Sequence, residues 1–307
     1  MINVVDIAIK QYDHIDKNII QALRDVVWQA SRFLSGSTSN ETPYEAVESI
    51  SLALTDWLAK DCVITTALID DRNFYFYGIE PSVFIKSVDP AFDLTLIHVG
   101  LPKLYKNKPL YNVALYHELG HFIDTHYNIV GRSELLAQPT HATNTDAYKT
   151  EINHRKEYFA DLFAAAYTGE ALINFLTNFV GSQKESKTHP STASRIVMMS
   201  DLINGKTNPT IDLFNQVLTQ LGLSELEVRY IIPDIQKEFD DLRPYKIKDQ
   251  SELHGIYPAC WKYYDEALSG NNSNWADYEM REVINVINDL MEKTIRNRMI
   301  VTKWEAV

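Results

Sequence analysis

The order of hydrophobic and polar residues divides the chain into a first part with short strands and a second part built of helices. Apolar positions recur at helical spacing over residues 15–34. A second helix is expected to begin at Thr42, with Pro43 in the first helical position and Glu45 completing a capping box. Short segments rich in β-branched and aromatic residues then predict three or four strands of a small sheet over residues 62–99. These segments are CVITTALI, NFYFYGI, SVFIKSV and DLTLIHVG.

From Pro109 onward the apolar spacing is almost entirely that of helices. The predicted helices span residues 109–127, 146–167, 169–180, 190–204, 210–222, 224–242, 258–268 and 276–299. In the last of them, an apolar stripe from Met280 to Ile295 is expected to pack inside the molecule. The fold class is therefore α+β, with strands early in the chain and helices after them.

Composition and charge narrow the range of partners. The chain has 307 residues, a net charge of −12 and a pI near 5.2. This charge argues against a partner rich in phosphate, such as a nucleic acid or an anionic membrane surface. Only two cysteines occur, Cys62 and Cys260, so a zinc site made of cysteines is excluded and free thiols are expected. The sequence shows no signal-peptide pattern and no apolar segment long enough to span a membrane, so we expect a cytoplasmic protein. The sequence does not indicate the oligomeric state.

The segment NVALYHELGHFIDTH contains the pattern H-E-x-x-H within a predicted helix. Residues four apart lie on one helix face, so His117 and His121 can direct two imidazole nitrogens at one ion. Glu118 lies on the adjacent flank, where it can reach a water molecule without itself being a ligand. Zinc is the metal that this arrangement favours, and a polar helix face carrying histidines by chance is the alternative.

A catalytic zinc needs a third protein ligand and an open position. The metzincin pattern requires Gly and His further along the same segment, but Asp124 and Tyr127 occupy those positions. The later helix NHRKEYFADLFAAAY instead offers Glu157 and Asp161, two carboxylates four residues apart in otherwise apolar surroundings. We expect Glu157 to be the third ligand and Asp161 to accept the other ring N–H of a ligating histidine. The alternative is a solvated acidic stripe.

The three segments HELGH, EYFAD and THPSTASRI, in this order, resemble the gluzincin metallopeptidases, most closely the HtpX-like and CAAX-prenyl-protease-like family. The resemblance covers roughly residues 95–200, whereas members of that family are usually embedded in a membrane. It implies a zincin-like catalytic domain over residues 1–205 and leaves residues 206–307 as a helical C-terminal region. It also implies that His189 and Arg195 line the active site, His189 facing the developing oxyanion and Arg195 holding the carboxylates. A simpler interpretation of His189, which precedes Pro190, is that it caps a helix.

The chemistry expected from this site is hydrolysis of a peptide or protein substrate, with Zn²⁺ activating a water molecule and Glu118 as general base. In related zincins the substrate lies along the edge strand of the sheet, and the resemblance makes FDLTLIHVG the candidate for that strand.

Two other functions compete with this interpretation. Glu118 with His121 and Glu151 with His154 form two E-x-x-H pairs, which are typical of di-iron carboxylate bundles. The second competing function is that of a zincin-like module without catalytic activity, which binds a partner through its helical C-terminal region.

Overall fold

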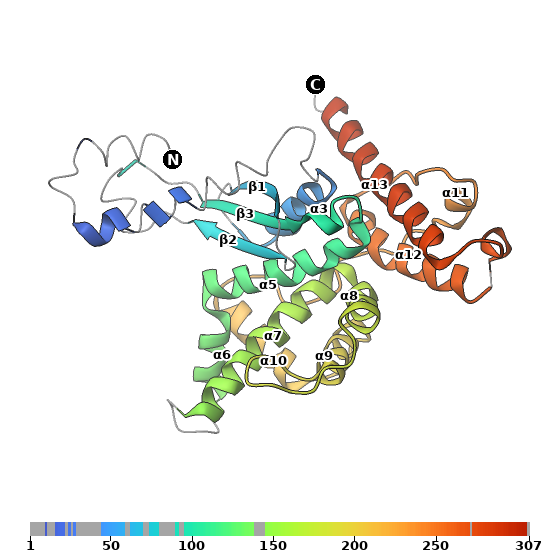
Figure 1. Ribbon diagram of the computed structural model, residues 1–307. Helices are drawn as coiled ribbons and strands as arrows, with labels where there is room; N and C mark the ends of the chain where they lie inside the picture. Colours follow the sequence, from blue (N-terminus) through green and yellow to red (C-terminus); the bar gives the residue numbers. More distant parts are fainter. Residues whose placement is uncertain are drawn as a thin grey trace. The chain divides into compact units, whose positions relative to one another are not determined.

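The computed structural model describes residues 44–58, 62–69, 74–79, 90–91, 95–137, 145–270 and 272–305, and scattered positions between 10 and 28 (Figure 1). The chain forms two compact units. The first consists of residues 1–43 and 58–106, and the second of residues 44–57 and 107–307. The strands belong to the first unit and helices α3 and α5 to α13 to the second, which agrees with the predicted α+β class.

The first unit contains a mixed sheet of three described strands. They are β1 (Cys62–Ile69), β2 (Tyr75–Ile79) and β3 (Thr95–Pro102), in the order β1-β3-β2. β3 pairs parallel with β1 and antiparallel with β2, so both of its edges are hydrogen-bonded. The prediction that FDLTLIHVG forms an edge strand is therefore wrong, because β3 has no free edge to offer a substrate. The segment SVFIKSV and most of the predicted helix 15–34 lie outside the described residues.

The second unit begins with α3 (Tyr44–Thr55), whose predicted capping residues Thr42 and Pro43 lie outside the described residues. A short 3-10 turn, η3 (Pro109–Asn112), leads into α5 (Val113–Tyr127), which carries the HELGH motif. Residues 128–145 carried no predicted helix, but α6 (Ile129–Ala137) follows α5 at once. Asn128 adopts a left-handed conformation with φ of 52°, and the Asp124 carboxylate accepts the backbone N–H of Val130 at 2.7 Å, which caps the new helix.

The middle of the second unit follows the predicted helices closely. The elements are α7 (Asp146–Thr168), α8 (Glu170–Phe175), the π-turn η4 (Leu176–Val180), α9 (Thr192–Ile203) and α10 (Pro209–Gln220). Thr145, Ser191 and Asn208 cap α7, α9 and α10 through their side chains. His189 therefore does not cap α9, because that position belongs to Ser191.

The predicted helix 224–242 is mostly wrong, because only α11 (Gln236–Asp240) forms within it. The preceding residues run as irregular chain against other helices, with the Ile231 N–H donating to the Ser251 carbonyl. α12 (Gln250–Leu268) begins well before the predicted start at 258 and contains Pro258 in its interior. A Cβ atom at Gly255 would lie 1.8 Å from the Ile231 carbonyl oxygen, so glycine permits this close contact.

The short turn η5 (Ser273–Trp275) and the long helix α13 (Met280–Glu305) complete the chain. The predicted apolar stripe of α13 is largely buried, at Val283, Ile287, Leu290, Met291 and Ile295. α12 contacts α7 and α8, and α13 contacts α3 and η3. The second unit thus contains helices from before and after residue 205 in the sequence. That a catalytic domain ends at residue 205 stays a prediction.

Candidate metal centre

The candidate centre lies where α5 and α7 pack against each other (Figure 1). Glycine inside a helix costs about 1 kcal/mol relative to alanine, so Gly120 needs a structural reason. A Cβ atom at Gly120 would lie 2.6 Å from the Ala160 Cα atom, closer than real Cβ atoms approach. The absence of a side chain at Gly120 therefore lets the two helices meet at the turn that carries His117 and His121.

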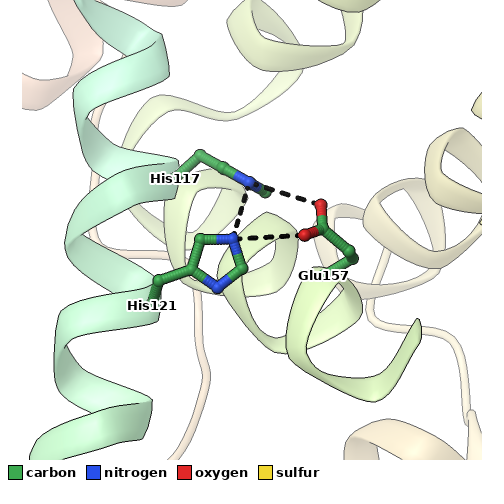
Figure 2. A group of neighbouring side chains, drawn as sticks. All are labelled: His117, His121 and Glu157. Carbon is green, nitrogen blue, oxygen red and sulfur yellow. Dashed lines mark hydrogen bonds and ion pairs between the residues drawn. The ribbon is translucent and has the colours of Figure 1, made fainter. Parts of the chain in front are cut away.

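Three side chains from these helices converge, as Figure 2 shows. His117 Nε2 lies 3.5 Å from Glu157 Oε2, and His121 Nε2 lies 3.4 Å from Glu157 Oε1. The two imidazole Nε2 atoms are 3.1 Å apart. One ligand atom from each residue lies within 4.8 Å of the others, so the group could hold a metal ion. No other group of three or more such side chains occurs in the described part of the chain.

The surroundings of Glu157 fit a bound cation. Its side chain is only 10% exposed, and Oε2 is buried without a hydrogen-bond partner among the described residues. A buried carboxylate oxygen that accepts no hydrogen bond is costly, and a bound cation would compensate for the missing bond. Burial raises the pKa of Glu157, but His121, His117 and Arg195 outweigh this and hold it below its usual value. The carboxylate is therefore ionised, as a metal ligand must be.

Asp161 and Arg195 support this group from one side. His117 Nδ1 lies 2.9 Å from Asp161 Oδ1, so the ring donates its N–H there and leaves Nε2 free to act as a ligand. Arg195 donates from Nε and Nη2 to the two oxygens of Asp161, each at 2.7 Å. Burial raises the pKa of Asp161, but the Arg195 guanidinium and His117 reverse this and lower it to about 2. Arg195 Nη2 also lies 3.7 Å from Glu157 Oε2, so Arg195 holds both carboxylates, as the family resemblance implied.

Glu118 has the surroundings of a free carboxylate beside the group. It is half-buried and makes no hydrogen bond or ion pair with any described residue. Burial raises its pKa, while His117 and His121 act in the opposite direction. The carboxylate is thus close to the candidate ligands and not occupied by another partner.

His189 lies at the exposed rim of the group. Its side chain is 52% exposed, and Nε2 is 3.6 Å from Glu157 Oε1. Its other ring nitrogen, Nδ1, is 2.8 Å from the Thr188 hydroxyl. The structure thus brings all of the predicted site residues to one place, with His189 the most accessible of them.

The other sequence candidates have different roles. Glu151 pairs with Arg155 at 2.8 Å, and His154 donates to the Ser186 carbonyl at 2.7 Å. Neither Glu151 nor His154 belongs to the candidate ligand group, so the second E-x-x-H pair that a di-iron site would need has other partners. Asp124, which occupies the glycine position of the metzincin pattern, is buried and caps α6.

Sequence reasoning missed Ala160, the residue of α7 against which Gly120 packs. The available signal was the pairing of a glycine in HELGH with the alanine that follows Phe159 in EYFAD. Small residues at matching places on two helices allow their backbones to approach. Pattern alone did not indicate which of the several alanines in this helix makes the contact.

Other findings concern residues beyond the candidate centre. Among the described helices, none combines the length and the apolar composition that a membrane-spanning segment needs. No protein-family model matches the chain, and searches of curated proteins and of solved structures also returned no match.

Proposed function

We propose that this protein is a zinc-dependent metallopeptidase of the gluzincin type, with a zincin-like catalytic core. The observation that carries the proposal is the convergence of His117, His121 and Glu157 beside the unpaired carboxylate of Glu118. Two histidines and one glutamate are the ligand set of thermolysin-like catalytic zinc sites, which keep a fourth position for water or substrate.

Each residue of the site has a distinct part in the proposed reaction. Bound zinc would supply Lewis acidity and lower the pKa of a water molecule towards neutrality. Glu118 takes a proton from the attacking water and passes it to the leaving amine. The exposed His189 donates a hydrogen bond to the oxyanion that develops on the substrate carbonyl. Asp161 keeps the His117 ring in position, and Arg195 neutralises the two buried carboxylates.

Metal analysis and peptide hydrolysis together test the proposal. We expect about one zinc ion per chain in the purified protein and hydrolysis of an unbiased peptide pool. Glu118→Gln should keep the zinc and lose hydrolysis, because the amide cannot accept the proton. Glu157→Ala should weaken zinc binding, and hydrolysis is lost as a consequence, because the substitution removes a ligand. Glu279→Gln is the matched control, because it removes the same charge at an exposed position of the chain.

Other outcomes would favour the competing functions. Stoichiometric zinc without hydrolysis of any peptide, and no effect of Glu118→Gln, would favour a catalytically silent module. Two iron ions per chain would favour the di-iron alternative. Hydrolysis that survives Glu118→Gln unchanged would rule out Glu118 as the general base.

A further inference from the structure

A second feature of α7 is a pocket of about 790 Å³ lined by α6, α7, α10 and the irregular segment before α9. Ala147, Pro209 and Leu213 supply part of its apolar wall. Its charged and aromatic lining consists of Glu151, His154, Arg155, Tyr158 and Glu185. None of these residues belongs to the candidate ligand group.

The pocket adjoins the candidate metal centre through α7. Tyr158 immediately follows Glu157 in sequence, and His154 precedes it by three residues. At a rise of 1.5 Å per residue, His154 and Glu157 are about 4.5 Å apart along the helix axis. The pocket and the candidate metal centre therefore lie on neighbouring stretches of one helix.

The segment between α8 and α9 connects the same two places. Glu185 lines the pocket, and His189 lies 3.6 Å from Glu157. Between them the chain is fastened to α7, because His154 donates to the Ser186 carbonyl at 2.7 Å and Asn153 donates to the Lys187 carbonyl at 3.1 Å. The pocket and the rim of the metal centre are thus two ends of one short, anchored segment.

The charges in the pocket do not balance. Arg155 donates from Nη2 to Glu151 at 2.8 Å, while its Nη1 is buried without a hydrogen-bond partner among the described residues. Glu185 is exposed, and among the described residues no cationic side chain lies within ion-pair distance of it. The lining therefore presents one carboxylate that is free to accept a cation, beside apolar surface that suits an aliphatic chain.

We propose that this pocket is the subsite that selects a lysine or arginine side chain of the peptide substrate, with Glu185 binding the cationic head group. The inference rests on the proposed peptidase function. The methylene groups of such a side chain contact Ala147 and Leu213, and its ammonium or guanidinium donates to the Glu185 carboxylate. An acidic side chain would meet the like charges of Glu185 and Glu151, so it is disfavoured.

Peptide selection without turnover tests the inference. Zinc-loaded Glu118→Gln protein is mixed with a random hexapeptide pool, and the bound peptides are separated and analysed by mass spectrometry. We expect enrichment of lysine and arginine at one position by about two- to fivefold over leucine, as an ion pair with an exposed carboxylate would give. Adding Glu185→Gln should abolish the enrichment, whereas adding Glu279→Gln should leave it intact. Adding Ala147→Trp should reduce it, because the larger side chain takes up the part of the apolar wall where the methylene groups would lie.

Each result decides the matter. Enrichment that depends on Glu185 and on an open pocket supports the inference. Bound peptides without basic enrichment, enrichment that persists in the Glu185→Gln protein, or no bound peptide at all overturns it. Selective binding together with an unmutated protein that never cleaves the selected peptides would contradict the peptidase function but leave the pocket as a binding site.

Discussion

Asp161 determines how the His117 ring is presented. It is fully buried and accepts from His117 and, twice, from Arg195. With the proton of His117 held on Nδ1, the lone pair on Nε2 faces His121 and Glu157. The sequence indicated this role because a carboxylate one turn after Glu157 lies on the same face of an otherwise apolar helix.

The substitution Asp161→Asn should therefore weaken metal binding without removing a ligand. The amide accepts the ring N–H less strongly and leaves the buried Arg195 without a full counter-charge, so the His117 ring is less well held. Loss of such a supporting contact costs about 10–100-fold in metal affinity. Competition with a chelator of known zinc affinity measures the change, and Asp212→Asn, at an exposed position of α10, is the control. Equal zinc affinity in the Asp161→Asn protein would contradict this role.

The ligand-bearing helices could be predicted from sequence, whereas several of their surroundings could not. α5 and α7 combine clear apolar periodicity with motif residues, and both form where expected. Residues 224–235 carry a similar periodicity but follow tertiary contacts with α12, where Gly255 admits the chain backbone. The sequence pattern also did not predict that β3 is the central strand, because the order of strands depends on contacts between distant segments. Non-local packing is what the sequence pattern leaves open.

The contact between α5 and α7 gives a prediction at the scale of these elements. In Gly120→Ala, the new Cβ atom would meet the Ala160 backbone, and the helices must move apart. Overpacking of this kind costs about 1–3 kcal/mol in stability. It should also reduce zinc affinity, because Glu157 moves away from the two imidazoles. Thermal unfolding and chelator competition measure both effects.

Asn285→Ala serves as the control for this substitution, because it introduces alanine at an exposed position of α13, away from the contact between α5 and α7. If Gly120→Ala had the stability and zinc affinity of the unmutated protein, the close contact would not be what positions the ligands.

At the scale of the molecule, the first and last helices of the second unit are joined by ion pairs, one of which includes a buried carboxylate. Glu45 of α3 is 1% exposed and lies 3.6 Å from Arg296 of α13. Nearby, Arg298 donates to Glu48 at 2.6 Å. Burial raises the pKa of Glu45 to about 7, because the ionised carboxylate is poorly solvated and Arg296 only partly compensates. The stability of the unit should therefore depend on the protonation state of this one residue.

The direction of this dependence follows from the two pKa values of Glu45. In the unfolded chain the group titrates near 4.5, and in the folded protein near 7. The stabilisation from the protonated form is complete below pH 4.5 and is lost as pH rises through 7. Between pH 5 and 8 this amounts to about 2–3 kcal/mol. Glu45→Gln cannot ionise, so its stability relative to the unmutated protein should rise by that amount over the same interval. Urea unfolding of both proteins at pH 5 and pH 8 measures the difference in their free energies of unfolding. The contributions of the other titrating groups are the same in both proteins and cancel. A difference independent of pH would mean that Glu45 titrates in the folded protein as it does in the unfolded chain.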